Sequence, residues 1–388
     1  MSDASRMSLS YGNEVTYGTA PGGQPRELRY TGESLKAAIG TARSAEVKGD
    51  RMTADILRIA NQPAGNIQAE LSYLSHGDLI AAALWSAAAT TSVTLTNTIF
   101  AINSGAGTLT RSSGSFVSDG FVAGSWIRVS GFANAGNNSV FKVTTVAALT
   151  LTLAVMGSTL VTESAGATVT IKQSFDRIGG TTQNSLTIEK NFADNTNDYE
   201  LLTGCLVNTW GLVIPVQGII THDFGIVAQD IVSAGASAFS GALLTSTNPP
   251  IPAVTGVFKF CENGTAFSAC AFSMQLNNNL RPRNVIGTYG PASYGSGTQD
   301  ISGTLEAYYT DEALIDKAIN ATTLTASSLS IVFNDTLGNY VILDIPAIKF
   351  TGAERLGTGR DGDVLARMEW QAYRHSDGTQ IRVANIAA

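Results

Sequence analysis

GNIQAELSYLSHGDLIAAAL, at residues 65–84, returns in altered form as GTLEAYYTDEALIDKAI at residues 303–319. Each version opens with an alternating Gly-x-(Ile/Leu)-x-Ala segment, in which Gly65 corresponds to Gly303. Strict alternation of apolar and polar residues predicts a half-buried strand. A short polar turn and a helical pattern follow in both versions, so the pair predicts one strand–turn–helix unit that occurs twice.

Two further short sequences are repeated in the same order. Ser-Leu-(Thr/Ser)-Ile stands at residues 185–188 and again at 328–331, and Leu-x-Ile-Pro stands at 212–215 and again at 343–346. Four features that keep their order along the chain indicate duplication. The sequence therefore predicts two copies of one β-rich domain.

The predicted fold is mainly β, of the α+β type. Each copy is expected to be a β-sandwich or barrel with an antiparallel sheet and a flanking helix, and a small all-β domain is inserted in the first copy. The helix of the second copy is expected to begin after Asp311 and to carry an apolar stripe that includes Ile319. The expected boundaries are an extended arm at 1–35, copy 1 at 36–91 and 183–247, the insert at 92–182, a proline-rich linker at 248–253, and copy 2 at 254–388.

The insert differs from the rest of the chain in composition. It is rich in Ser, Thr, Gly and Val, and runs such as WIRVSGF and VFKVTTV alternate between turn sequences, as in a small barrel or sandwich. Its basic residues, Arg111, Arg128, Lys142 and Lys172, outnumber its acidic ones. The basic excess and polar strands suggest a domain that decorates the outside of an assembly.

Composition excludes several functions. Charged residues make up 14% of the chain and the formal net charge is −7, whereas a nucleic-acid-binding surface needs clustered Lys and Arg. Three cysteines, Cys205, Cys261 and Cys270, are too few for a disulfide framework, and buried thiols are expected. We expect no cofactor and no metal, because no His or Cys spacing matches a metal site.

The sequence also lacks a recognisable reaction centre, so we expect no enzyme. Gly357-x-Gly359-x-x-Gly362 has the letters of a dinucleotide-binding loop, but a period-2 pattern follows it where a helix is required. The uncharged stretch 201–222 is broken by Gly and Pro and predicts two strands rather than a membrane span. With no apolar leader at the start, we expect a soluble protein.

One pattern of charge recurs in four predicted strands, each of which carries a carboxylate near its middle. In IQAELSY and ARMEWQAY, alternation places the apolar residues in the core and the carboxylate on the opposite face. Solvated polar faces are the rule for antiparallel sheets, so an ordinary wet surface is the simplest interpretation. The four positions are Glu70, Asp223, Glu306 and Glu369.

Outside the insert, nearly the whole chain resembles the major tail tube proteins of bacteriophages with long, non-contractile tails, in their larger form. The resemblance rests on EVTYGTAP (14–21), EVKGDRMTADILR (46–58), FSMQLNNNLRPRNVIGT (272–288), the duplicated strand and helix, and the closing LGNYVILDIPAIKF. The insert resembles the β-domains that such proteins carry on the tube exterior.

The resemblance implies a structural virion protein whose sheets join into rings, which stack into a hollow tube that conducts DNA. Under this hypothesis Glu70, Asp223, Glu306 and Glu369 face the lumen, where negative charge repels phosphates. Two domains in one chain imply three chains in a pseudo-hexameric ring. The implied partners are further copies of the chain, a tape-measure protein, tail-tip and terminator proteins, and transiently passing DNA, with no membrane.

Ring-to-ring contacts are expected from the N-terminal arm and from the loop near residue 360. The candidate residues are Tyr17, Pro21, Gly357, Arg360 and Asp361. We expect assembly in the cytoplasm of the bacterial host and final location in the virion tail. Two alternatives remain open: another phage component, such as a tail terminator or capsid decoration protein, and a β-rich adhesin or carbohydrate-binding module.

Overall fold

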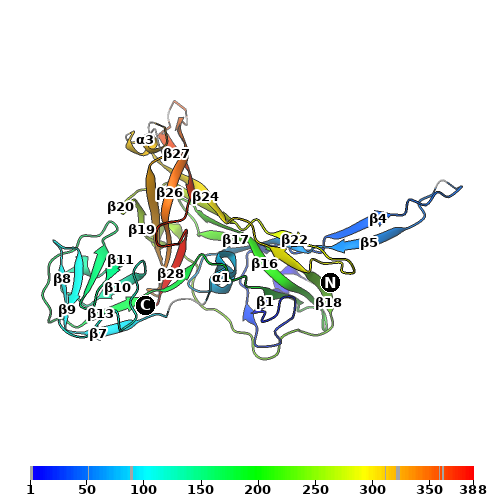
Figure 1. Ribbon diagram of the computed structural model, residues 1–388, viewed down its shortest axis with the longest axis horizontal. Helices are drawn as coiled ribbons and strands as arrows, with labels where there is room; N and C mark the ends of the chain where they lie inside the picture. Colours follow the sequence, from blue (N-terminus) through cyan, green and yellow to red (C-terminus); the bar gives the residue numbers. More distant parts are fainter. Residues whose placement is uncertain are drawn as a thin grey trace.

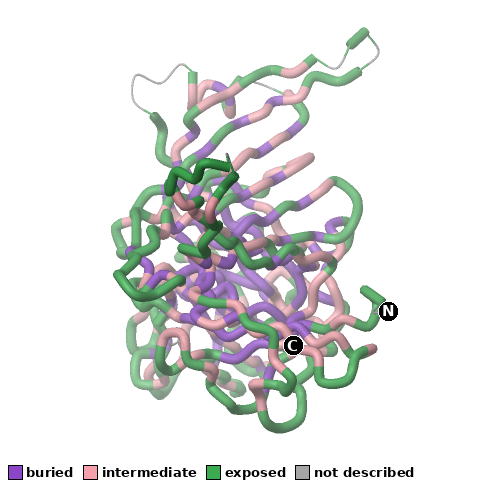
Figure 2. The backbone as a smooth tube through the Cα atoms, turned by 90° about the vertical axis from the view of Figure 1, so that its right-hand side faces the viewer, coloured by how far each residue is buried: buried purple, intermediate pink, exposed green. Residues whose placement is uncertain are grey.

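The computed structural model describes residues 3–50, 52–87, 91–310, 312–319, 324–357, 359–360 and 362–388. Its secondary structure is mainly β, which confirms the predicted fold class. Figure 1 shows a central body with a long hairpin on one side and a separate small sheet on the other. Buried residues concentrate in the body, and exposed residues predominate in the long hairpin (Figure 2).

The first half of the chain forms one set of antiparallel strands. In order of pairing, the strands run β2–β1–β15–β16–β17–β6–β3, with β18 beside the start of β16. Helix α1 (Gly77–Leu84) covers this set, and a hairpin of β4 and β5 projects between β3 and β6. The strand bounds are β1 (Met7–Asn13), β2 (Arg26–Glu27), β3 (Gly32–Glu33), β4 (Ile39–Arg43), β5 (Ile56–Asn61), β6 (Ala64–Glu70), β15 (Leu186–Phe192), β16 (Tyr199–Ile214), β17 (Thr221–Val227) and β18 (Asp230–Ala234).

The second half repeats this order strand for strand. Its pairing order is β20–β19–β25–β26–β27–β24–β21, with β28 beside the start of β26, hairpin β22–β23 between β21 and β24, and helix α3 (Ala313–Ile319). A short helix precedes each set, η1 (Ala4–Arg6) before β1 and α2 (Ala253–Gly256) before β19. The strand bounds are β19 (Val257–Glu262), β20 (Thr265–Ala266), β21 (Ala271–Asn277), β22 (Arg281–Arg283), β23 (Ser293–Gly295), β24 (Asp300–Tyr308), β25 (Ala326–Asn334), β26 (Tyr340–Gly357), β27 (Val364–Ala372) and β28 (Arg382–Ile386).

The pairings identify which repeated sequences are true counterparts. The Ser-Leu-x-Ile sequences lie in β15 and β25, where Ile188 is opposite Leu202 and Ile331 is opposite Leu343. Leu343 therefore corresponds to Leu202, and the expected match of Leu343 with Leu212 is wrong. That match was a resemblance of letters, because Leu212 lies farther along β16 where it pairs with β17.

The two halves are joined into one sheet by β16 and β21. Residues Thr209–Ile214 pair antiparallel with Phe272–Asn277. The linker expected at 248–253 runs across the first half: Pro250 bridges to Ser72, and Ile251 is fully buried. Ser72, which the alternation in IQAELSY places on the same side as Glu70, is buried beneath this linker.

The expected N-terminal arm is part of the body. Residues 7–13 form β1, which pairs along its whole length with β15. Leu9, Tyr11 and Leu28 are buried in the main core. The interpretation as an extended arm is thus wrong for this segment, because its local turn signals gave no indication of a partner strand about 180 residues away.

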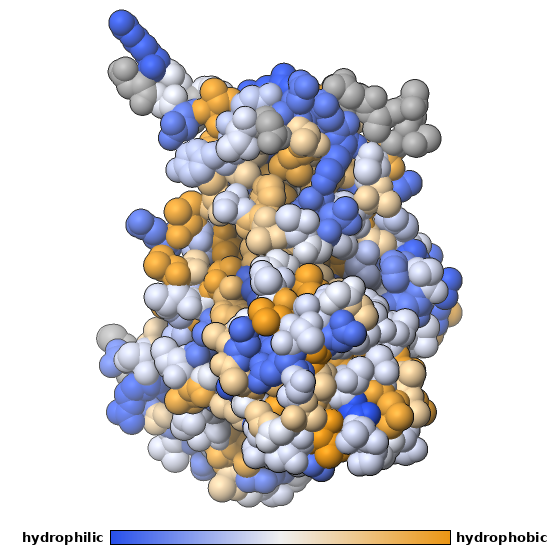
Figure 3. Space-filling model, turned by 90° about the vertical axis from the view of Figure 1, so that its left-hand side faces the viewer, coloured by the Kyte–Doolittle hydropathy of each residue, from blue (hydrophilic) through white to orange (hydrophobic). Residues whose placement is uncertain are grey.

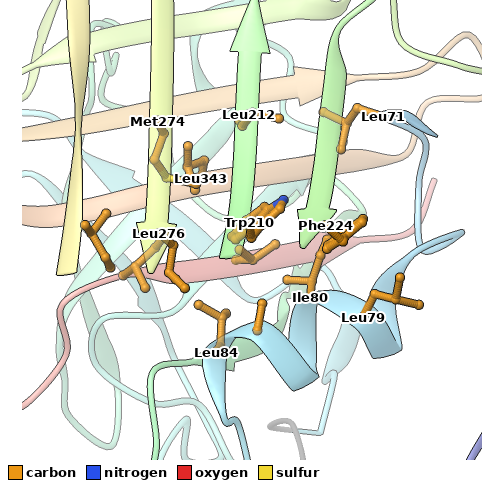
Figure 4. Close-up of a cluster of buried hydrophobic side chains, with 14 of the residues drawn as sticks. Leu71, Leu79, Ile80, Leu84, Trp210, Leu212, Phe224, Met274, Leu276 and Leu343 are labelled. Atoms are coloured by element: carbon orange, nitrogen blue, oxygen red, sulfur yellow. The ribbon is translucent and has the colours of Figure 1, made fainter. Parts of the chain in front are cut away.

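The main core lies on one side of the joined sheet, under helix α1. Phe224 and Trp210 stack at 6.4 Å between ring centroids, and Leu79, Ile80 and Leu84 of α1 pack beneath them (Figure 4). In the second half Ile315 of α3 is buried, whereas Ile319, expected in its apolar stripe, is 59% exposed. Asp311, the expected cap of α3, lies outside the described residues.

The insert forms its own seven-stranded antiparallel sheet with its own core. The strands occur in the order β7–β13–β10–β11–β12–β9–β8. Their bounds are β7 (Thr94–Asn97), β8 (Phe100–Asn103), β9 (Thr108–Arg111), β10 (Trp126–Ser130), β11 (Val140–Val146), β12 (Thr150–Ala154) and β13 (Val169–Gln173). The chain then returns through β14 (Phe175–Ile178), which pairs with β28 of the second half.

The basic residues of the insert largely serve to dock it on the second half. Lys142 forms an ion pair with the buried Asp344 at 2.7 Å, and Arg128 donates to the carbonyl of Gly338 at 3.2 Å. Lys172 donates to the carbonyl of the last residue. A shared apolar cluster completes the contact, formed by Trp126, Val140, Met156, Cys261, Val332, Ile342, Ala384 and Ile386. The basic excess is therefore mainly an internal contact rather than a free outer charge.

Candidate functional site

The joined sheet has one apolar face and one polar face, and the polar face is the candidate site. It runs across β6, β17, β16, β21, β24 and β27 without interruption. Directly paired residues point to the same side of an antiparallel sheet, so each side chain can be assigned to a face from the register. Every second residue along these strands belongs to the polar face.

All four carboxylates singled out from the sequence lie on this face. Glu70 and Glu369 share one row across the sheet, which passes through Thr221, Val213, Ser273 and Thr304. Asp223 lies in the neighbouring row with Gln68, Gly211, Gln275, Ser302 and Gln371. Glu306 lies in the row on the other side, opposite Arg367. Adjacent rows are about 7 Å apart, since they are separated by two residues of strand.

The polar face also carries charged residues other than the four carboxylates selected from the sequence. Asp300 and Glu354 add carboxylates, and Lys36, Lys349 and Arg367 add cations. Among the described residues named here, six carboxylates face three cations on this side of the sheet. The alternation of Arg367 with Glu369 could have revealed one of these cations, because both were expected on the same side of β27.

Arg367 holds two of the carboxylates together. Its guanidinium lies 3.5 Å from Glu306 on β24 and 3.6 Å from Glu354 on β26. These partners remain partly exposed, so each pair contributes little to the stability of the isolated chain, about 0–1 kcal/mol. The arrangement leaves an excess of negative charge over the rest of the face.

Asp223 occupies the most enclosed position of the four. Burial raises the pKa of its carboxyl group above the usual value. Gly211 lies opposite it, and a Cβ at that position would be 2.2 Å from Asp223 Oδ1 and 2.9 Å from Gln275 Oε1. The absence of a side chain at Gly211 leaves room for the Asp223 side chain across β16, and a larger residue there would have to displace it.

The apolar face fixes the orientation of these strands. Met368 and Trp370 of β27 are buried, and Trp370 stacks on Phe272 with 5.7 Å between ring centroids. Gly303 provides the space for this ring, since a Cβ there would lie 2.6 Å from Trp370. A slip of one residue would exchange the two faces and expose these rings, so the register fixes the carboxylates on the polar side.

The described residues contain no cluster with the composition of a metal site. No group of three His, Cys, Asp or Glu side chains in this part of the chain could hold a metal ion. His76 and His222 do meet, with 3.1 Å between Nδ1 and Nε2, but both are buried in the core. No helix within the described ranges is long and apolar enough to cross a bilayer. Cys205 and Cys261 are buried free thiols, and Cys270 is partly exposed.

The residues proposed for stacking lie in separate places. Tyr17 and Pro21 belong to the loop after β1, where Tyr17 packs beside Gly204. Gly357 and Arg360 lie at the far end of the β26–β27 hairpin, and Asp361 lies outside the described residues. Figure 1 shows the two sites at different ends of the body.

The longest projection is the β4–β5 hairpin, which the sequence analysis did not predict. It extends from the body as a two-stranded ribbon (Figure 1). Ile39, Ile56, Leu57 and Ile59 are each at least 55% exposed on it. A two-stranded ribbon with exposed apolar side chains is marginally stable alone and marks an interaction surface. The turn sequence EVKGDRM between apolar segments was the available signal.

The opposite side of the molecule has a different character. Figure 3 shows the side on which the insert lies, where apolar residues gather in the upper middle of the view and hydrophilic and apolar residues are mixed below. The insert adds no large apolar projection like that of the hairpin.

Comparison with known families supplies the last observation. A family model described as phage tail tube protein matches residues 4–372, a range that includes the insert and every strand of both sets except β28. A search of curated proteins found no match.

Proposed function

The chain belongs to the phage tail tube protein family, and on that premise we propose that it forms stacked rings around a channel that conducts viral DNA. It is a structural protein of the virion tail. The observation that carries the proposal is the continuous sheet with one apolar face and one acidic polar face. A ring of such sheets encloses a channel with a uniform lining.

Three chains would complete one ring. The pairings of the first half recur in the second, so each chain offers two equivalent units already joined by β16 and β21. Closed cyclic symmetry is the usual outcome when one interface repeats around an axis. We propose that the two sets of strands are two tandem tube domains, joined by the linker at 248–253 within one ring.

The polar face would line the channel. Glu70, Asp223, Glu306 and Glu369 then repel the phosphates of DNA, which prevents the counterion release that drives binding to basic surfaces. DNA would pass without being held. Under this proposal the four carboxylates line a channel, rather than lying on an ordinary solvent-exposed surface of the sheet.

Stacking would use the projecting segments. The β4–β5 hairpin is the strongest candidate because its apolar residues have no cover within the described chain. Tyr17, Pro21, Gly357, Arg360 and Asp361 remain candidates on the two other surfaces. The insert would lie outside the tube as a decoration, and assembly would take place in the host cytoplasm with tape-measure, tail-tip and terminator proteins.

The test is charge reversal of the polar face in assembled tails. We expect the fourfold variant Glu70→Lys, Asp223→Lys, Glu306→Lys and Glu369→Lys to slow DNA ejection strongly at low salt and less at high salt, since phosphate contacts are screened by salt. The corresponding Gln and Asn variant should show a smaller effect. Glu312→Lys is the matched control, because Glu312 is exposed beside α3 on the other side of the sheet.

Ejection is measured by the release of DNA from particles after triggering, at two salt concentrations. Tails with the fourfold variant that eject DNA at the rate of the parent would show that this face does not line the channel.

A further inference from the structure

One strand edge in the second half lacks, among the described residues, the partner strand that its counterpart in the first half has. In β16, residues Thr209–Ile214 pair with β17 on one side and with β21 on the other. The corresponding part of β26, Gly352–Gly357, pairs with β27 on one side. Among the described residues nothing pairs with its other edge. The second half therefore ends in an open strand edge at the position where the first half continues into its neighbour.

The complementary edge lies at the other end of the sheet. Gly32 is opposite Gln68 of β6, and Lys36 bridges to Ala64. In the second half, Ala271 is opposite Glu306 and Gln275 is opposite Ser302. Matching these registers makes residues 32–38 the counterpart of β21. The outer side of residues 32–38 has no strand beside it within the described chain.

We propose that Gly352–Gly357 of one copy pairs antiparallel with residues 33–38 of the next copy, so that the contact between chains repeats the contact between halves. This inference rests on the proposed ring. Within the chain, Gly211 is opposite Gln275. Glu354 is the counterpart of Gly211, and Lys36 is the counterpart of Gln275. The same register between two copies therefore places Glu354 opposite Lys36. The same transfer places Ala353 opposite Ala37.

The transferred register is chemically complementary. Glu354 and Lys36 are both exposed, belong to the polar face and carry opposite charges. Ala353 and Ala37 are small and would meet on the apolar side without steric conflict. Addition of a strand to an open edge satisfies main-chain groups that are otherwise left to water.

In the single chain, side chains partly cap the edge formed by residues 33–38. The N–H of Leu35 donates to Glu33 Oε2 at 2.8 Å, and its carbonyl accepts from Lys190 Nζ at 2.6 Å. These two side-chain contacts satisfy main-chain groups at the centre of the edge, as expected for a protected edge strand. The strand of the next copy would replace them during ring closure.

Paired cysteines test the register directly. The variant Glu354→Cys with Lys36→Cys, assembled into tails and treated with a short thiol-specific cross-linker, should give covalent oligomers that stop at the size of the ring. Directly opposed residues have Cβ atoms about 5 Å apart, which is within reach of such a reagent. The matched control is Val213→Cys with Ser273→Cys, an opposed pair within one chain, which should remain monomeric on a denaturing gel.

Charge exchange provides a second measurement on the same pair. Glu354→Lys alone and Lys36→Glu alone each place like charges opposite one another, and the double variant restores the attraction. We expect each single exchange to lower the association constant of one junction about fivefold. A ring has three such junctions, so the constant for ring formation falls on the order of 100-fold. The double variant should recover it.

The outcomes separate this inference from the proposed function. Rings or tubes that form but give no cross-linked oligomers, with a working Val213–Ser273 control, would overturn the edge assignment and leave the tube intact. A parent chain that forms neither rings nor tubes in infected cells would overturn both.

Discussion

Acidification should destabilise this protein through two histidines in its core. His76 Nε2 lies 2.7 Å from the carbonyl oxygen of Arg29 and donates a hydrogen bond to it. His76 Nδ1 must then accept from His222 Nε2, 3.1 Å away. A proton added to His76 Nδ1 would therefore abolish this hydrogen bond, and a proton added to His222 Nδ1 would be buried without an acceptor.

The magnitude follows from the pKa of His76. Burial lowers this pKa from 6.5 to about 4, and burial together with His76 lowers the pKa of His222 well below its usual value. Because both folded pKa values lie below the unfolded value, the stabilisation is fully present above pH 6.5 and is lost as the pH falls from 6.5 towards 4. At pH 5, His76 alone costs about 2 kcal/mol, and His222 adds a cost of the same sign.

Thermal unfolding followed by circular dichroism at pH 7.5 and pH 5, at constant ionic strength, measures this effect. A loss of about 2 kcal/mol lowers the midpoint by about 2–3 °C in a protein of this size, because the unfolding entropy of about 2.1 cal/mol/K per residue is summed over the whole chain. His222→Phe should reduce the difference between the two pH values, because one buried proton acceptor is removed. His375→Gln should leave it unchanged, since His375 is exposed.

An unchanged midpoint between pH 7.5 and pH 5 would refute the reasoning about the histidine pair. An equal loss in the parent and in His222→Phe would show that other groups cause the acid sensitivity.

Two further variants test contacts that stabilise the sheet beneath the polar face. Lys190→Met should cost about 3 kcal/mol, because it leaves Glu33 and Glu200, at 3.1 Å and 3.0 Å from Lys190 Nζ, without their buried cation. Urea denaturation measures this loss, and a cost below about 1 kcal/mol would contradict a role for a buried ion pair. Gly303→Ala should cost about 1–3 kcal/mol and weaken the near-ultraviolet circular dichroism signal of Trp370, because the added methyl group would lie 2.0 Å from the carbonyl oxygen of Ser273 and 2.6 Å from the indole, so that both must move. An unchanged signal and midpoint would show that the strand can accommodate a side chain there.

Local alternation predicted what depends on neighbours in sequence. Along β27, alternation correctly placed Met368 and Trp370 in the core and Glu369 on the polar face. The repeated strand and helix likewise led to α1 and the strand before it. Such patterns arise because a strand presents alternate residues to opposite faces, whatever it pairs with.

Long-range contacts decided the features that the sequence did not reveal. Residue Ser72 is buried by a linker that returns from residue 250, and Lys142 is paired with Asp344 about 200 residues away. Residues 7–13 were expected in an arm because their partner, β15, lies beyond the insert. None of these contacts can be predicted from a short window of sequence. The limits of the two tube domains and the lumen-facing role of the carboxylates stay predictions.

Cryo-electron microscopy of intact tails tests the central claim most directly, because it gives the number of chains in each ring and the face that lines the channel. The account predicts three chains per ring, two matching units from each chain, and Glu70, Asp223, Glu306 and Glu369 facing the channel. Six chains per ring, or a channel lined by any other face of the sheet, would contradict it.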